Sequence, residues 1–341
     1  MDFPTTAQPN TTWDDTAYTS GYLFCQTSGM LMSILGVVSN LINVSVFIKQ
    51  GLHERVNFAL FCLSVSEFFA SLNAFAVTLT IFFSMYPPSA TVDWVAIVMF
   101  FFWFRGLFAD TSSCLTLFIS IERCYCVMQP FKFNTTFTFK TTKMVVLFIL
   151  VFVIASYLPL MSSMRYTYYT NPELNITILT AEYLQLYYWM VTYNDYVLGI
   201  LLAIVCQVCI FVCAVLMYRG LRKSTEIRDH TREFQVSESQ TGKLARDKLP
   251  GLSKKEKRVV KLVLMLAILY LPTGIPQIIY AIFRGYIPEK YYFLCACVVL
   301  FFVTANGSFA IFIYYNFSSV YHSTLLCQNK SGKNLKRKNS H

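Results

Sequence analysis

Long apolar stretches separated by short polar segments run along almost the whole chain. About 20 consecutive apolar residues in a helix are enough to cross the hydrocarbon core of a bilayer. Seven stretches reach this length, near residues 22–48, 57–84, 94–121, 143–164, 191–218, 259–283 and 291–315. The pattern therefore predicts an all-α membrane protein, built as a bundle of seven transmembrane helices.

The composition supports this fold class. Of the 341 residues, 55% are hydrophobic and only 13% are charged, whereas soluble domains carry roughly 25% charged residues. Charged side chains inside the stretches, such as Glu67, Arg105 and Asp110, must face other helices rather than lipid alone. A single soluble core is therefore a poor description of this chain.

Lysine and arginine are distributed unevenly between the two sets of loops. Residues 1–21 contain neither, whereas the segment 219–261 and the C-terminal tail are basic. Because basic loops stay in the cytoplasm, we expect a multi-pass plasma-membrane protein with its N-terminus outside and its C-terminus inside. The net charge of +10 then suits anionic lipid headgroups and an acidic partner. Nucleic acid is not an expected partner, because the basic residues flank membrane spans.

The expected topology divides the chain into three parts. Residues 1–21 form an extracellular tail, which is too polar to be a cleavable signal peptide; residues 22–315 form the seven-helix domain; residues 316–341 form the cytoplasmic end. Asn10 and Asn175 stand in Asn-x-Thr sequons on outer segments, so glycosylation is expected there.

The cytoplasmic end begins with an amphipathic pattern. Residues 316–327, NFSSVYHSTLLC, predict a short helix lying on the inner face of the membrane after the seventh span. Cys327 closes this helix and is either a palmitoylation site or a free cytosolic thiol.

The chain carries no recognised signature of enzymatic or metal chemistry. It has no Ser–His–Asp set, no HExxH, no phosphate-binding loop and only four histidines. Most of its eleven cysteines lie inside the apolar stretches and are interpreted as packing residues. Cys25, Cys295 and Cys297 are exceptions near the outer face, where a bridge from Cys25 to one of the other two can form. We therefore expect neither an enzyme nor a metal centre.

One charged dipeptide, Glu122-Arg123, lies at the end of the third apolar stretch. Buried charges are costly in a bilayer, so an ionisable pair at this depth indicates a functional site. The alternative is a solvated pair at a helix end, reaching out to the headgroups.

Five segments carry a family resemblance, and they occur in order on successive helices. They are GVVSNLINV in the first span, NFALFCLSVSEFF in the second, ERCYCVMQPF after the third, Tyr270-Leu271-Pro272 in the sixth and ANGSFAIFIYYNF in the seventh. Together they resemble the motifs of rhodopsin-like G-protein-coupled receptors. SNLINVSVFIKQGLHERVN and ERCYCVMQPFKF also look like the gastropod chemosensory receptors within that family.

The resemblance implies a coupling site at the cytoplasmic end. Arg123 would pair with Glu122 in the quiet receptor and release it on activation; breaking a buried pair costs about 3–5 kcal/mol, so the pair can act as a latch. Phe131 would enter a hydrophobic socket on a heterotrimeric G protein, or be an aromatic side chain at the membrane interface. The full set of coupling and activation residues is Glu122, Arg123, Pro130, Phe131, Tyr218 and Tyr314.

Several family features are missing. Ala310-Ile311 stand where the family has Asn-Pro, and the fifth span lacks its proline near Ile210. No cysteine lies near the outer start of the third span or within 165–193, so the family's outer disulfide is absent. The acid expected on the sixth span is replaced by Leu252, with Glu256 as the nearest substitute.

The resemblance also implies a buried polar cluster that holds sodium in the family. Its residues here are Asn40, Glu67, Ser112 and Asn306. A carboxylate with hydroxyl and amide neighbours suits a small hard cation. The alternative is a protonated, hydrogen-bonded Glu67.

Arg105 is the sharpest indication of the ligand. It lies eighteen residues before Arg123, roughly 27 Å along a helix, and so near the outer end of the hydrocarbon core. A guanidinium there favours a carboxylate, sulfate or phosphate group. The alternatives are an internal pair with an acid such as Asp195, or an outward-reaching side chain; Asp110 is a candidate counter-charge. Tyr270, Gln277 and Tyr280 of the sixth span are expected to line the same cavity.

The sequence thus predicts a G-protein-coupled receptor that transmits the binding of an extracellular ligand to a heterotrimeric G protein. The expected ligand is a small chemosensory cue, and it is anionic if Arg105 contacts it. A neuropeptide receptor of the same fold is the first alternative. A seven-helix transporter or channel is the second, although such proteins usually show internal repeats or broken helices at the midplane, which this chain lacks.

Overall fold

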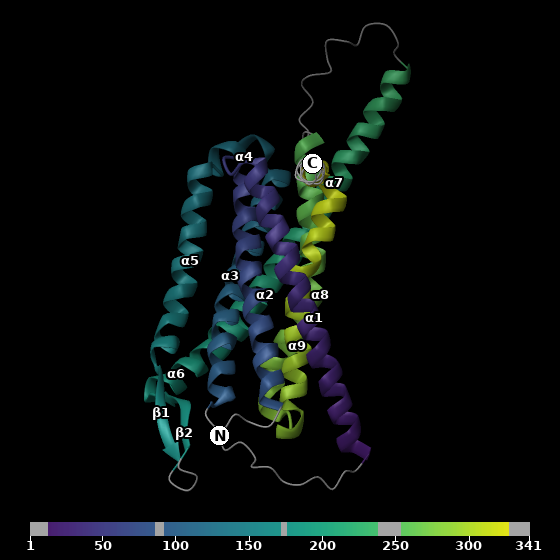
Figure 1. Cartoon of the computed structure of the whole chain (residues 1–341). Helices are drawn as coiled ribbons and strands as arrows, with labels where there is room; N and C mark the ends of the chain where they lie inside the picture. The colour runs from purple at the N-terminus through teal and green to yellow at the C-terminus, as the bar shows by residue number, and fades with distance from the viewer. Residues whose placement is uncertain (1–12, 86–91, 172–175, 238–253, 327–341) are drawn as a thin grey trace, which may run out of the picture.

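The computed structural model describes residues 13–85, 92–171, 176–237 and 254–326. The elements are α1 (Trp13–Gln50), α2 (Arg55–Met85), α3 (Trp94–Met128), α4 (Pro130–Thr136), α5 (Phe139–Ser162), β1 (Met164–Asn171), β2 (Ile176–Tyr183), α6 (Gln185–Tyr193), η1 (Asn194–Leu202), α7 (Ala203–Ser237), α8 (Lys254–Phe283), η2 (Arg284–Tyr286) and α9 (Glu289–Phe317). Figure 1 shows the long helices side by side.

Seven helices are long and apolar enough to cross a membrane, which confirms the predicted fold class. Six are α1, α2, α3, α5, α8 and α9. The fifth span, Gln185–Lys223, is built from α6, η1 and the first part of α7. It starts six residues earlier than the sequence pattern predicted. Within it, η1 is a π-helical stretch, a wider form of helix that marks a local irregularity without any proline.

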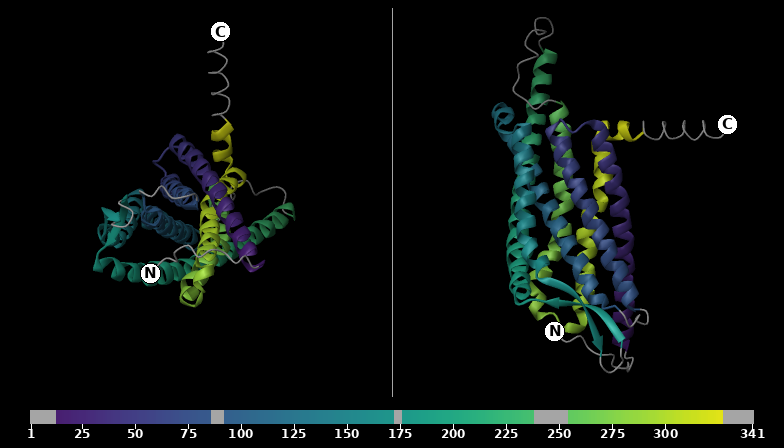
Figure 2. Two further views of the ribbon diagram at one scale, coloured as in Figure 1. Left: turned by 60° about the horizontal axis from the view of Figure 1, so that its bottom comes forward. Right: turned by 60° about the vertical axis from the view of Figure 1, so that its left-hand side comes forward.

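The bundle has two distinct ends (Figures 1 and 2). We call the end with α4 the α4 end and the end with β1 and β2 the hairpin end. α3 packs against α2, α5, α7 and α8, and α1 packs against α2 and α9. Close packing of α1 depends on Gly36, because a Cβ there would collide with the Ser71 hydroxyl of α2 and lie 2.8 Å from that of Ser308 on α9.

The segment between the fourth and fifth spans forms the hairpin β1–β2, where the sequence pattern predicted a loop without strands. Its antiparallel register runs from Met164↔Tyr183 to Asn171↔Ile176. β2 is fastened to the start of α3: the amide of Asp93 donates to the carbonyl of Leu179 at 2.8 Å, and Thr180 Oγ1 donates to Asp93 Oδ2 at 2.8 Å. The other carboxylate oxygen of Asp93 caps α3 by accepting from the amides of Val95 and Ala96. Hydrogen bonds therefore hold the hairpin at the start of α3, a position where the rhodopsin-like receptors that the sequence resembles have a disulfide.

The cysteines at the hairpin end do not form the disulfide that the sequence predicted. Cys25, Cys295 and Cys297 are unbridged, so the expected bridge from Cys25 is wrong. Cys297 instead donates through Sγ to Gln26 Oε1 at 3.4 Å.

A short helix follows the seventh span, as predicted, but it begins later. α9 continues through Phe317, Ser318 is extended, and residues 319–326 are helical. This helix turns across the α4 end (Figure 2, right). Tyr321 holds it there, since its hydroxyl donates to Asn43 Oδ1 of α1 at 2.6 Å. Asn10, Asn175, Leu252 and Cys327 lie outside the described residues.

Candidate functional site

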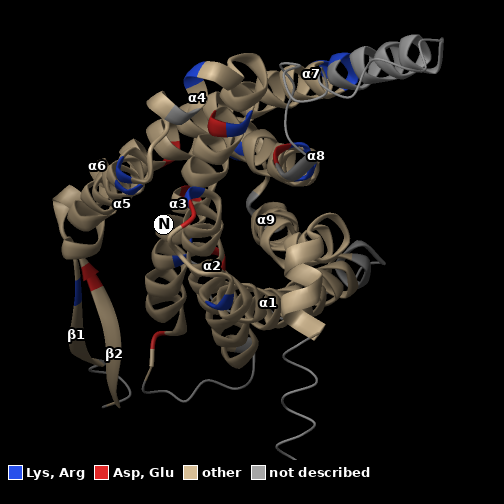
Figure 3. Cartoon of the chain, turned by 90° about the horizontal axis from the view of Figure 1, so that it is seen from above, with Lys and Arg blue, Asp and Glu red and all other residues tan. Residues whose placement is uncertain are grey.

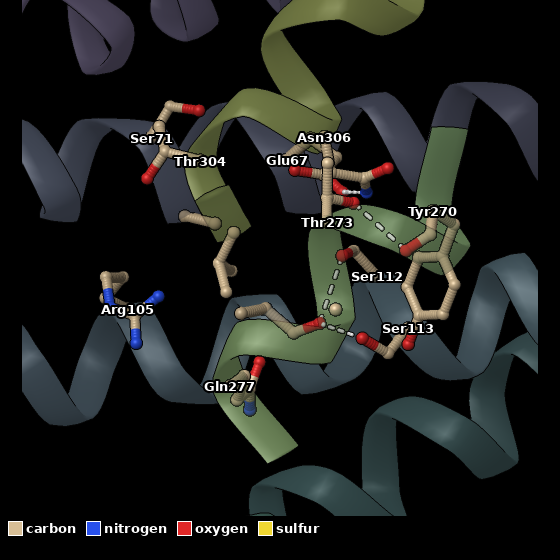
Figure 4. Close-up of a pocket in the computed structure, with 14 residues that line it drawn as sticks. Glu67, Ser71, Arg105, Ser112, Ser113, Tyr270, Thr273, Gln277, Thr304 and Asn306 are labelled. Atoms are coloured by element: carbon tan, nitrogen blue, oxygen red, sulfur yellow. Dashed lines mark hydrogen bonds between the residues drawn. The ribbon is translucent and has the colours of Figure 1, made fainter. Parts of the chain in front are cut away.

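A cavity lies between α2, α3, α8 and α9. Figure 4 shows the side chains that converge on it. Of the described residues that line it, two are charged, Arg105 of α3 and Glu67 of α2. The rest are small, hydroxyl-bearing, amide or aromatic: Ala70, Ser71, Ala109, Ser112, Ser113, Tyr270, Thr273, Gly274, Gln277, Val303, Thr304 and Asn306.

Arg105 lines the cavity, and no direct ion pair joins it to an acid among the described residues. Its Nε is buried and has no hydrogen-bond partner among the described residues, and its guanidinium carbon lies 5.5 Å from the centre of the Phe102 ring. The alternative pairing with Asp195 is wrong, because Asp195 Oδ2 accepts from Arg284 Nη1 at 2.6 Å. Asp110 Oδ2 accepts from the Tyr157 hydroxyl at 2.7 Å, and the Asp110 carboxylate also attracts Arg105 without a direct ion pair, so Asp110 stays a candidate counter-charge. The buried Nε of Arg105 can still donate to a ligand.

Two of the three expected α8 residues line the cavity. Tyr270 and Gln277 are seven residues apart, about two helical turns, so both face it. Tyr280 does not line it, which corrects the expectation; its ring centre lies 5.8 Å from that of Tyr292 on α9. Gly274 stands between the two turns, and a Cβ there would collide with the amide of Gln207 on α7. This contact holds α8 close to α7.

The expected sodium-binding cluster is divided between two cavities. Glu67, Ser112 and Asn306 line the first, and Asn306 Nδ2 donates to Glu67 Oε1 at 3.4 Å. A second cavity is lined by Asn40, Glu67 and Asn306, among others. The Nδ2 of Asn40 donates to the carbonyls of Gly36 at 3.0 Å and Gly307 at 3.3 Å rather than to Glu67. Glu67 and Asn306 line both cavities, and sodium binding stays a prediction.

Glu122 and Arg123 form a buried ion pair at the α4 end. Arg123 Nη2 donates to Glu122 Oε1 at 2.6 Å, and the two side chains are only 3% and 1% exposed, respectively. The alternative of a solvated, outward-reaching pair is therefore wrong. Glu122 Oε2 and Arg123 Nε have no hydrogen-bond partner among the described residues. Breaking a buried pair costs about 3–5 kcal/mol, so the pair has the burial that the predicted latch needs, and its role as a latch stays a prediction.

Sequence reasoning missed Phe133 of α4. Its ring is 2% exposed and lies against two guanidiniums, with Arg55 at 4.5 Å and Arg123 at 5.2 Å from the ring centre. Phe131, two residues earlier, is 80% exposed, as a residue for a partner socket should be. No periodicity in this seven-residue helix distinguishes the two phenylalanines, so only the fold separates their roles.

Tyr314 and Tyr218, the two tyrosines expected to take part in activation, lie in different surroundings. Tyr314 is buried against Phe47, with ring centres 5.3 Å apart, whereas Tyr218 of α7 is exposed. Pro130 opens α4. Glu256 lies in the first turn of α8. α8 begins at the α4 end (Figure 1) and packs against α3, the helix that carries the Glu122–Arg123 pair.

Comparison with known families identifies one match. The sequence model described as serpentine type 7TM GPCR chemoreceptor Srw matches residues 27–327. The match contains both cavities, the Glu122–Arg123 pair and α4. No curated protein matches the chain significantly.

Proposed function

The chain belongs to the serpentine 7TM GPCR chemoreceptor family Srw, and from this premise we propose that it detects a small extracellular cue with an anionic group and passes the signal to a heterotrimeric G protein. The observation that carries the ligand class is Arg105, which lines the cavity and whose buried Nε has no hydrogen-bond partner among the described residues. Cavities between the helices of a bundle are common sites for small molecules, which favours a small cue over the neuropeptide of the first alternative. The family is one of receptors rather than enzymes or transporters.

The proposed orientation puts the hairpin end outside the cell and the α4 end in the cytoplasm of a plasma-membrane protein. Lys and Arg support it, because they occur on α4, α7 and α8 at the α4 end (Figure 3), and basic segments stay in the cytoplasm. The ligand cavity then lies on the outer side of Glu67, and the latch lies at the G-protein side. The ordered motifs support the rhodopsin-like class and the gastropod-type subgroup as finer proposals.

The coupling step is proposed to begin at the buried pair. Anion binding at Arg105 on α3, against Tyr270 and Gln277 on α8, would change how these helices pack. Because α8 also begins at the α4 end and packs against α3, a shift of α8 would alter the surroundings of Arg123 and open the α4 end. Phe131 would then contact the G protein. The sodium ion, if it binds, would do so at Glu67 and favour one of the two states.

The experiment is a paired set of variants in cells, read by calcium and cyclic AMP during a screen of small acids, amino acids and peptides. Arg105→Ala should abolish the response to an anionic agonist, because the ligand loses its charged partner, while surface expression stays unchanged. Arg123→Ala should abolish nucleotide exchange while ligand binding is still measurable.

Arg165→Ala is the matched control, since Arg165 is exposed on β1, away from the cavity. An unchanged dose–response curve for Arg105→Ala would remove Arg105 from the ligand site. Ligand-gated current without any G-protein signal would instead favour the channel alternative and overturn the proposed function.

A further inference from the structure

The two charges in the ligand cavity have opposite signs and come from different helices. Arg105 projects from α3 and Glu67 from α2, and the other described lining residues are neutral. The two side chains are not joined by an ion pair in the part of the chain that the structure describes. The cavity therefore presents a separated cation and anion, and both lose solvation when a ligand displaces water.

The charges are about two helical turns apart. Ser112, which contacts the Glu67 carboxyl, follows Arg105 by seven residues on α3, so the two levels differ by roughly 10 Å at 1.5 Å per residue. Figure 4 shows Arg105 standing apart from the group formed by Glu67, Asn306 and Ser112. The space between is bordered by small apolar and hydroxyl side chains, including Ala70, Ala109 and Val303.

A buried charge is costly unless a complementary group pairs with it. A simple acid would pair with Arg105 and leave Glu67 facing an apolar tail. A simple amine would pair with Glu67 and leave Arg105 unpaired. A ligand carrying both charges would satisfy both side chains at once.

We propose that the ligand is a zwitterion with several methylene groups between its ends, whose carboxylate binds Arg105 and whose ammonium binds Glu67. This inference rests on the proposed function and specifies the ligand class of its cavity. The guanidinium offers two parallel N–H donors to the carboxylate, and the ammonium donates to the Glu67 carboxylate. The methylene chain would pass along the small apolar side chains of the lining, such as Ala70, Ala109 and Val303.

The test compares three probes of one chain length on the purified full-length receptor in nanodiscs, with affinity measured by calorimetry. The probes are 6-aminohexanoic acid, hexanoic acid and hexylamine. 6-Aminohexanoic acid should bind at least tenfold more tightly than either singly charged probe. Comparison with 4-aminobutyric and 8-aminooctanoic acids then measures the preferred charge separation. This comparison uses the unaltered protein, so it does not depend on how any variant folds.

Two variants test which side chain binds each end of the probe. Arg105→Gln and Glu67→Gln should each weaken 6-aminohexanoic acid at least tenfold. Glu67→Gln should leave hexanoic acid unchanged, and Arg105→Gln should leave hexylamine unchanged. Arg165→Gln and Glu182→Gln are the matched controls, because these two residues face each other on the hairpin and are exposed.

Equal affinities for the three probes would overturn the proposal that the ligand is a zwitterion. Failure of every aminoalkanoic acid to bind would overturn it as well. If hexanoic acid binds as tightly as 6-aminohexanoic acid and needs Arg105 alone, the ligand is a simple anion and the proposed function stands. If sodium stabilises the receptor through Glu67 without altering probe binding, Glu67 holds a cation rather than the ligand. Loss of G-protein coupling is measured separately, with Arg123→Ala, so failure of the proposed function is distinguishable.

Discussion

At the scale of single residues, the ring of Phe133 lies against the guanidinium of Arg123. The guanidinium of Arg123 is shared between Glu122, through one hydrogen bond of 2.6 Å, and the ring of Phe133, at 5.2 Å. Arg55 lies against the same ring. An aromatic face attracts a cation by about 0.5–2 kcal/mol. The ring therefore adds to the force that holds Arg123 in its buried position, and it links α4 directly to the latch.

Replacing the ring tests this role. Phe133→Leu keeps a similar apolar volume and removes the negatively charged ring face, so Arg123 is held less firmly. If the attraction is about 0.5–2 kcal/mol, the latch equilibrium should shift roughly 2- to 30-fold toward release. The measurement is ligand-independent nucleotide exchange on the G protein, which should rise.

Phe137→Leu is the control, because Phe137 lies on the neighbouring turn and packs against Phe133 with ring centres 5.8 Å apart. Phe137→Leu also removes one phenyl ring, but the Phe137 ring does not lie over Arg123 in the described structure. Equal basal exchange in the two variants would show that Phe133 acts only as packing.

The fastening of the hairpin to α3 operates at the scale of elements. Asp93 uses one carboxylate oxygen to cap α3 and the other to accept from Thr180, so a single side chain sets the start of the helix and the position of β2. The hairpin is also joined to α3 at Ala96, whose carbonyl accepts from the Tyr166 hydroxyl at 3.2 Å. Non-covalent contacts of this kind leave the hairpin freer to open than a disulfide would.

Thr180→Val tests the fastening. Valine keeps the shape of threonine but cannot donate to Asp93, and hydrogen bonds to charged groups contribute about 1.5–3 kcal/mol. Amide hydrogen exchange in residues 176–183 should therefore become roughly 10- to 150-fold faster, and the apparent midpoint of thermal unfolding should fall only slightly.

Thr177→Val is the matched change on the same strand, since among the described residues the Thr177 hydroxyl bonds to that of Thr170 on the exposed side, at 3.2 Å, and not to Asp93. If both variants exchange at the same rate, the Asp93 contact does not hold the hairpin.

The orientation of the bundle belongs to the scale of the whole molecule. A tag at residue 1 should bind antibody on intact cells, and a tag after residue 341 should bind only after permeabilisation. The physical reason is the excess of Lys and Arg at the α4 end, which resists translocation. The measurement is antibody labelling by flow cytometry, with permeabilised cells as the control in which both tags must label. Labelling of the C-terminal tag alone on intact cells would reverse the proposed orientation.

The sequence by itself determined the fold class, because seven apolar stretches of membrane-spanning length leave few alternatives in a bilayer. It also singled out Glu122-Arg123 and Arg105 as candidate sites, since charges inside apolar runs are costly wherever they lie, and their roles stay predictions. These inferences depend on composition and helical spacing, which are local properties of the chain. The helix boundaries were less well determined, as the early start of the fifth span and the late start of the helix after Ser318 show.

Only the tertiary structure decided which charges meet. It paired Asp195 with Arg284 rather than Arg105, left Arg105 and Glu67 in one cavity, and placed Tyr280 outside the lining of that cavity. It also placed Phe133 under two guanidiniums and fastened the hairpin to Asp93. These contacts join residues that are distant in the sequence. They depend on how helices tilt and pack, and no local pattern in the sequence records that geometry.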